Sequence, residues 1–214
     1  MSIEAVLWDF GGVFTTSPFE AFNRYEAERG LPHDFIRSVN ARDPDTNAWS
    51  LFERSKCTAA EFDSLFAEES ERLGHRVPGR DVIALLSGEV RPRMVTALRR
   101  CKARFKVGCI TNNVASGEGP GMAGTSEKAR AIAEIMGLFD HIIESSKAGV
   151  RKPDPRIYAM MCEALEVAPQ ACVYLDDLGI NCKPAAEMGM RAIKVTHPDR
   201  AIAALEDLVG FPLG

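Results

Sequence analysis

Short apolar runs rich in β-branched residues alternate along this chain with amphipathic stretches of helical period. The four stronger runs are four to six residues long, which is the length of a buried strand. With a weaker fifth run, the predicted strands are 3–8, 105–110, 141–143, 171–175 and 192–195. The predicted helices between them are 92–103, 126–136, 155–165, 180–188 and 200–209. This alternation predicts an α/β fold with a Rossmann-like, doubly wound parallel sheet and helices on both faces.

Residues 15–89 depart from this rhythm. Helical patterns cover 19–29, 34–39, 47–54 and 58–73, and no convincing strand lies among them. Thr58 and Glu61 have the spacing of a capping box at the start of the last one. We therefore expect an α/β core domain of residues 1–14 and 90–214, with a small all-helical cap domain, 15–89, inserted after the first strand. Above the carboxyl edge of the sheet, such a cap would close over a ligand and exclude water.

Single residues mark several element boundaries. Pro155 stands at the favoured first position of its helix, and Gly137 and Gly189 follow theirs where a left-handed cap is expected. Two prolines after Lys152 predict an extended backbone up to the next helix.

Composition excludes several functional classes. The chain has 214 residues, is 46% hydrophobic and carries a net charge of −4, which gives no reason to expect nucleic acid or an anionic membrane as partner. Its six cysteines form no C-x-x-C pair and no zinc-binding spacing with histidine, so reduced thiols are expected. We see no signal-peptide pattern and no run long enough to cross a membrane. We expect a cytoplasmic protein, and the oligomeric state stays open.

Asp9 is the first candidate for chemistry, because it ends a buried apolar run and two glycines follow it within three positions. Parallel sheets bind their ligands at the carboxyl ends of their strands. A carboxylate there is a candidate nucleophile or metal ligand, although an isolated Asp after a strand is usually a turn former.

Three further polar groups end or follow predicted strands. Thr111 and Asn112 offer a hydroxyl and an amide that suit an oxyanion, and Lys152 can neutralise carboxylates or phosphate. Asp176 and Asp177 are adjacent acids that repel each other unless a cation is bound, and Mg²⁺ prefers such oxygen ligands. Together with Asp9, these groups predict phosphoryl transfer to a carboxylate.

A glycine-rich segment competes with this interpretation. Residues 119–124 satisfy G-x-G-x-x-G and precede a predicted helix. In a dinucleotide fold the first glycine follows its strand almost at once, whereas here several residues intervene. We interpret the segment as a mobile loop near the site.

In this order, the motifs resemble those of the haloacid dehalogenase superfamily. Asp9 matches the first motif, Thr111-Asn112 the second, Lys152 the third and Asp176-Asp177 the fourth. The resemblance covers essentially the whole chain. It is nearest to the phosphatase-like amino-terminal domain of soluble epoxide hydrolases, through the segments 143–153 and 175–185.

The resemblance implies a Mg²⁺-dependent phosphatase acting on a small phosphorylated metabolite. Asp9 would form an aspartyl-phosphate that water hydrolyses, and Thr111, Asn112 and Lys152 would hold the transferring oxygens. Asp9, Asp177 and the main-chain carbonyl of Gly11 would bind the metal. Asp177 is preferred to Asp176 because of its four-residue offset from Asn181. Asp176 would pair with Lys152 or bind through water, and Asn181 would orient the cluster.

Gly11 departs from the phosphatase pattern, which usually has a second Asp there as general acid and base. A slow enzyme, a preference for acidic leaving groups such as acyl or sugar-1 phosphates, and a donor from the cap are all open. The same departure keeps a 2-haloacid dehalogenase as an alternative, although that enzyme needs no metal and hence no acid pair. A weakened domain retained for binding is the third alternative. The physiological substrate is not encoded in a recognisable way.

Overall fold

The computed structural model describes residues 2–86, 88–113 and 126–214. Five parallel strands form one sheet in the order β3-β2-β1-β4-β5. The strands are β1 Ala5–Trp8, β2 Lys106–Thr111, β3 His141–Glu144, β4 Cys172–Asp176 and β5 Arg191–Lys194. In register, Trp8 lies beside Cys109 of β2 and Leu175 of β4. Asp9 therefore follows the central strand, between the carboxyl ends of its two neighbours.

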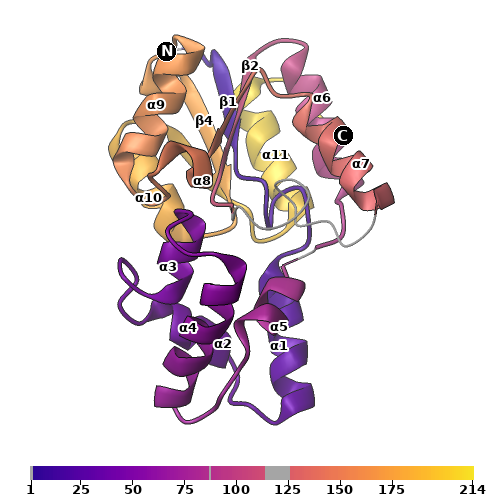
Figure 1. Ribbon diagram of the computed structural model, residues 1–214. Helices are drawn as coiled ribbons and strands as arrows, with labels where there is room; N and C mark the ends of the chain where they lie inside the picture. The colour runs from indigo at the N-terminus through magenta and orange to yellow at the C-terminus, as the bar shows by residue number, and fades with distance from the viewer. Residues whose placement is uncertain (1, 87, 114–125) are drawn as a thin grey trace.

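Helices cover both faces of the sheet (Figure 1). One face packs on α6 (Pro92–Lys102), α7 (Ser126–Met136) and α11 (Pro198–Val209) through an apolar cluster that includes Trp8 and Leu98. The other packs on α9 (Pro155–Leu165) and α10 (Gly179–Glu187) through a second cluster. The predicted α/β fold with a doubly wound parallel sheet is confirmed.

Most predicted elements agree with the structure to within three residues, and the differences are local. Among the described residues, two short α-helices were not predicted, α5 (Gly79–Ala84) and α8 (Ser145–Ala148), which begins directly after β3. The 3-10 helix Pro169–Ala171 was not predicted either. Gly189 has a φ of +96°, as expected, but Gly137 is not left-handed. The extended backbone predicted after Lys152 was wrong. The Lys152–Pro153 bond is cis, and the Asp154 N–H donates to the Arg151 carbonyl at 2.9 Å, which closes a turn.

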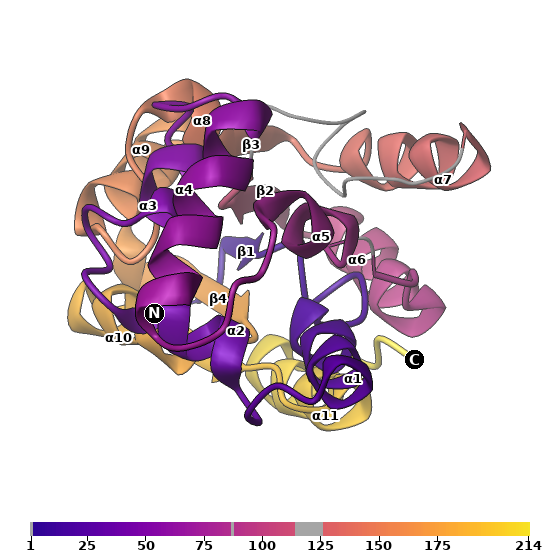
Figure 2. The ribbon, with the colours of Figure 1, turned by 60° about the horizontal axis from the view of Figure 1, so that its bottom comes forward.

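The helices between β1 and α6 form a separate layer beneath the carboxyl edge of the sheet (Figures 1 and 2). We call residues 18–86 the helical insert. It contains α1 (Pro18–Arg29), α2 (Phe35–Ala41), α3 (Ala48–Glu53), α4 (Ala59–Arg72) and α5. The insert has its own apolar cluster, centred on Phe22, Phe62 and Phe66. The capping box of Thr58 and Glu61 is present, as predicted. The division into domains at 15–89 stays a prediction.

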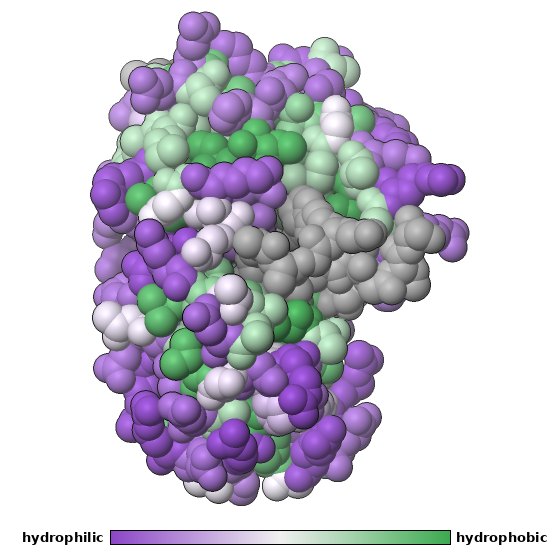
Figure 3. Space-filling model, viewed as in Figure 1, coloured by the Kyte–Doolittle hydropathy of each residue, from purple (hydrophilic) through white to green (hydrophobic). Residues whose placement is uncertain are grey.

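The two linkers of the insert lie side by side. Thr15 and Val90 form an antiparallel bridge, and the Thr16 N–H donates to the Glu89 carbonyl at 2.8 Å. Hydrophilic residues cover much of the outer surface of the insert, and hydrophobic ones gather nearer its junction with the α/β unit (Figure 3). Within the described residues, no helix combines the length and apolarity that a bilayer crossing requires. All six cysteines are free thiols.

Candidate active site

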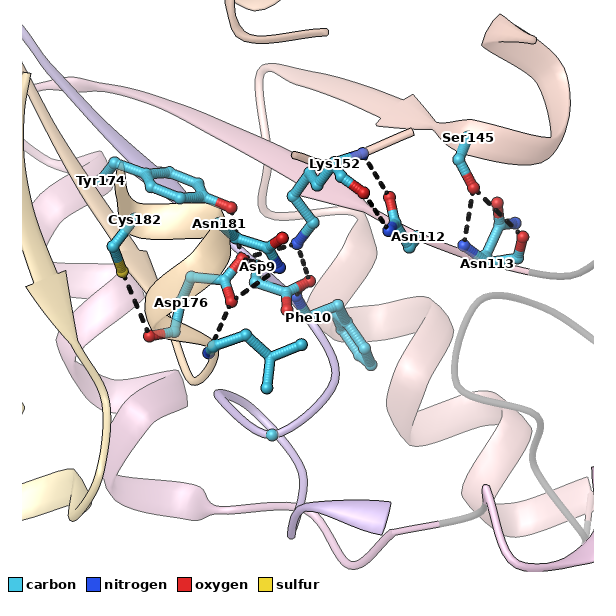
Figure 4. A network of polar contacts seen from close by, with 12 residues as sticks. Asp9, Phe10, Asn112, Asn113, Ser145, Lys152, Tyr174, Asp176, Asn181 and Cys182 are labelled. Atoms are coloured by element: carbon cyan, nitrogen blue, oxygen red, sulfur yellow. Dashed lines mark hydrogen bonds and ion pairs between the residues drawn. The ribbon is translucent and has the colours of Figure 1, made fainter. Parts of the chain in front are cut away.

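Lys152 lies between two carboxylates at the carboxyl edge of the sheet (Figure 4). Its Nζ is 2.7 Å from Oδ1 of Asp9 and 2.8 Å from Oδ2 of Asp176. Burial raises the pKa of Asp9 well above its usual value, Lys152 opposes that rise, and the Asp176 and Asp177 carboxylates add to it. Burial alone would lower the pKa of Lys152, but the attraction of Asp176 and Asp9 outweighs it and raises that pKa. The lysine is thus a fixed cation, and it links the third and fourth motifs to Asp9.

The carboxylate oxygens of Asp176 are occupied by hydrogen bonds within the protein. Besides Lys152, its fully buried carboxylate accepts hydrogen bonds from the Tyr174 hydroxyl, from Asn181 Nδ2 at 3.1 Å and from the Leu178 N–H at 2.8 Å. A carboxylate with four donors has little capacity left for a metal ion. Of the two arrangements open for Asp176, the structure shows the pairing with Lys152, and Asn181 lies where it orients that carboxylate.

Asp177 is placed differently from its neighbour. Its Oδ2 accepts the Ser17 hydroxyl at 3.3 Å, and a Cβ at residue 12 would lie only 2.1 Å from that same oxygen. Gly12 has a φ of +73°, so both its conformation and its missing side chain admit the carboxylate. Burial and the Asp176 charge raise the pKa of Asp177 to about 6, against the attraction of Lys152.

The donor set fits a hard divalent cation. Oxygens of Asp9, Asp176 and Asp177 lie within 4.8 Å of one another. Asp9 uses Oδ1 for Lys152 and for the Phe10 N–H, so Oδ2 has no protein partner among the described residues. Two carboxylates with raised pKa values and an all-oxygen set are what Mg²⁺ would stabilise. Asp9 and Asp177 are the residues that would hold it, and the Gly11 carbonyl as a third ligand stays a prediction.

The second motif lies at the same edge of the sheet. Thr111 ends β2 and is buried, and the Asn112 amide bonds the Lys152 backbone twice, donating to its carbonyl at 3.0 Å and accepting its N–H at 2.9 Å. The side chain of Asn112 thus supports Lys152 in this structure. Phosphate binding by Thr111 and Asn112 stays a prediction. Residues 119–124, interpreted above as a loop near the site, lie outside the described residues.

Sequence reasoning missed several residues that complete the site. Ser17 gave no signal, because its partner Asp177 lies 160 positions away in the chain. Tyr174 could have been found, since residues i and i+2 of a strand share a face and Asp176 follows it by two positions. Gly12 could have been found, since the second glycine of a G-G pair after a strand is a candidate for positive φ. The Gly12 carbonyl accepts the Arg91 guanidinium at 2.8 Å, which ties the first motif to the start of α6.

Comparison with known proteins agrees with this geometry. A family model for haloacid dehalogenase-like hydrolases matches residues 3–189. Acyl-CoA dehydrogenase family member 10 of Mus musculus is 32% identical over 99% of this chain and 20% of its own length. Bifunctional epoxide hydrolase 2 of Sus scrofa is 28% identical over 100% of the chain and 40% of its own length. The chain thus spans less than half of these two relatives.

Two further proteins match along most of their length. Phosphatase MT3486 of Mycobacterium tuberculosis (strain CDC 1551 / Oshkosh) is 30% identical over 91% of this chain and 88% of its own. A haloacid dehalogenase family enzyme of Bacteroides thetaiotaomicron, solved with magnesium and inorganic phosphate, superposes with a TM-score of 0.59 at 19% identity. It covers 90% of this chain and 94% of its own, a likeness of fold. The family that the motifs resemble is confirmed, and this chain belongs to the haloacid dehalogenase-like hydrolases.

Proposed function

We propose that this hydrolase is a Mg²⁺-dependent phosphatase that acts on a small phosphorylated metabolite through an aspartyl-phosphate. One observation carries the proposal: Asp177 is a second carboxylate beside Asp9 whose oxygen rests against Gly12 and is not bonded to Lys152. A dehalogenase that needs no metal has no use for that acid. Similarity along most of its length to a protein named as a phosphatase supports the same activity.

The proposed chemistry follows from the arrangement of charges. The Asp9 carboxylate attacks phosphorus, the P–O bond to the leaving group breaks, and water later cleaves the acyl phosphate to release inorganic phosphate. Lys152 neutralises phosphate charge, while Asp176, Tyr174 and Asn181 hold the lysine in place. When bound by Asp9 and Asp177, Mg²⁺ supplies further charge neutralisation.

Gly11 decides which leaving groups are favoured. It offers no side chain to protonate a departing alkoxide, and a general acid contributes roughly 10²–10⁴ in rate. We propose that the enzyme prefers phosphates whose leaving group is already acidic, such as acyl or sugar-1 phosphates. The helical insert, lying over the carboxyl edge of the sheet, would act as the cap that excludes water.

Two assays test the activity. Hydrolysis of p-nitrophenyl phosphate is measured with Mg²⁺ and with chelator, for the wild type, for Asp9→Asn and for the exposed control Asp207→Asn. We expect turnover that requires Mg²⁺, is lost in Asp9→Asn and is retained in the control. Metal-independent halide release from a 2-haloacid would show a dehalogenase instead. Inactivity in both assays would favour a binding module.

A further inference from the structure

Glu53, the last residue of α3, is a buried carboxylate at the junction between the helical insert and the α/β unit. Its side chain forms an ion pair with Arg151, the neighbour of Lys152, and the two side chains are 9% and 20% exposed. The fully buried Ser145 hydroxyl donates to the Glu53 carbonyl at 2.9 Å. Burial raises the pKa of Glu53, and the Arg151 guanidinium opposes that rise. One residue of the insert is therefore bound to the α/β unit through both its side chain and its backbone.

Another polar contact across the described junction, from the Ser17 hydroxyl to Asp177, comes from the linker just before α1 and not from an insert helix. Among described residues, the hydrogen bonds and ion pairs that join the insert helices to the α/β unit both end on Glu53. The apolar cluster of the insert shares no member with the two clusters of the α/β unit. A cavity of about 390 Å³ beside Arg151 is lined by Asp45 and Arg54 of the insert and by Arg151 and Asp154. Glu53 thus supplies the polar connection across this part of the junction.

The contacts of Glu53 lie on the side of the insert that faces away from its two linkers. The paired linkers attach the insert near α1 and α5, whereas α3 meets the α/β unit beneath α8, on the other side of the insert (Figure 1). An insert that turns about its linkers moves most at the side away from them. The contacts of Glu53 lie at that side, where they resist opening most effectively.

The partners of Glu53 lead directly to the reacting groups. Arg151 precedes Lys152 in the chain, so the ion pair restrains the turn that carries the lysine. The Ser145 hydroxyl also accepts the Asn113 N–H at 3.1 Å, next to the Asn112 amide that holds the Lys152 backbone. The turn that carries Lys152 thus contacts the insert directly through Arg151, and Ser145 of α8 links the insert to the segment that follows β2.

We propose that Glu53 and Arg151 form a clasp that seats the helical insert on the α/β unit and thereby positions Lys152 and Asn112 for phosphoryl transfer. Glu53 is a positioning residue in this scheme, because it acts through Arg151 and Ser145. The kinetic part of this inference rests on the proposed phosphatase activity, and the structural part stands without it.

The kinetic test is a double-variant cycle of Glu53→Gln, Arg151→Gln and the two combined. We expect each single variant to lower kcat for p-nitrophenyl phosphate by about ten- to a hundredfold, since misplacing a reacting group by about 1 Å can cost about a hundredfold. The combined variant should be no slower than the slower single one, because the pair acts as a unit. Glu71→Gln is the matched control: it removes a carboxylate from an exposed ion pair with Arg76 within the insert, and its kcat should equal that of the wild type.

Amide hydrogen exchange tests the clasp independently of activity. In Glu53→Gln and in Arg151→Gln, peptides spanning residues 48–54 and 145–154 should exchange at least about threefold faster than in the wild type, in keeping with local opening. Peptides of β1 should not change. Unchanged exchange in both segments, or a combined variant whose loss of kcat is the product of the two single losses, would overturn the proposal. If Glu53→Gln does not fold, Arg151→Gln alone decides the exchange result. A wild type without phosphatase activity would refute the proposed function, while the exchange result would still decide the clasp.

Discussion

Gly12→Ala tests how the second carboxylate is placed. The new Cβ would lie 2.1 Å from Oδ2 and 2.4 Å from Cγ of Asp177. The carboxylate would have to retreat by roughly 1 Å or more to restore van der Waals contact. Asp177 would then leave its position beside Asp9. The variant should therefore lose its response to Mg²⁺ even where it remains folded.

The stability effect of this variant has two parts that a control separates. An L-residue in the left-handed region is disfavoured by about 1–2 kcal/mol, partly offset by the reduced entropy of the unfolded chain. Gly30 has a φ of +65°, and no atom lies within 4 Å of the position that an alanine Cβ would take there, so Gly30→Ala measures the conformational part alone. We expect Gly30→Ala to lower the free energy of unfolding by about 1 kcal/mol. Gly12→Ala should lower it further, because Asp177 must also move.

The assay is urea unfolding of both variants and the wild type, with Mg²⁺ and with chelator. Mg²⁺ should stabilise the wild type and Gly30→Ala equally, because a ligand that binds only the folded state raises its stability by mass action. Gly12→Ala should show no such increase. An undiminished Mg²⁺ response in Gly12→Ala would refute the assignment of Asp177 to the metal.

Three other positions give predictions of their own. Gly11→Asp introduces a Cβ that would have no atom within 4 Å. This variant should hydrolyse an alkyl phosphate at least about tenfold faster, with a smaller gain for p-nitrophenyl phosphate, and Mg²⁺ binding should persist. The pKa of Asp177 is raised from 3.8 to about 6 in the folded protein, so folding favours the protonated carboxyl group. This contribution to stability is complete below the pKa of the unfolded chain, and it is lost as pH rises through the pKa of the folded protein. The rise in Tm on adding Mg²⁺ should accordingly be larger above pH 6 than below it, and a constant rise would contradict this. Gly108→Ala should lower the free energy of unfolding by about 1–3 kcal/mol without changing the Mg²⁺ response, because its Cβ would lie 2.5 Å from Sδ of Met161.

The elements of the fold were predictable because neighbouring residues encode them. Alternating strand and helix patterns gave the parallel sheet, and the rule that such sheets bind ligands at one edge placed Asp9, Thr111 and Asp176 together. Helix α8 escaped prediction because its four residues carry too little periodicity, and α5 because it begins at Gly79, a poor helix former. The turn at Lys152 escaped prediction because a residue that precedes a proline adopts extended backbone only on average.

The different contacts of Asp176 and Asp177 could not be predicted from the sequence. The two adjacent acids look alike in the chain, and only the resemblance to a family favoured one of them. In the fold, Asp176 faces Lys152, Tyr174 and Asn181, whereas Asp177 faces Gly12 and Ser17. Their different environments, and hence their different roles, come from packing and not from residue type.

By itself, the sequence determined the strands, the helices and which chemical groups lie at the ends of the strands, since these depend on residues close together in the chain. Only the tertiary structure decided which groups touch. Ser17 meets Asp177 across 160 positions, and Glu53 meets Arg151 across 98. Contacts at such separations depend on how the packed layers are oriented, and no local preference specifies that orientation.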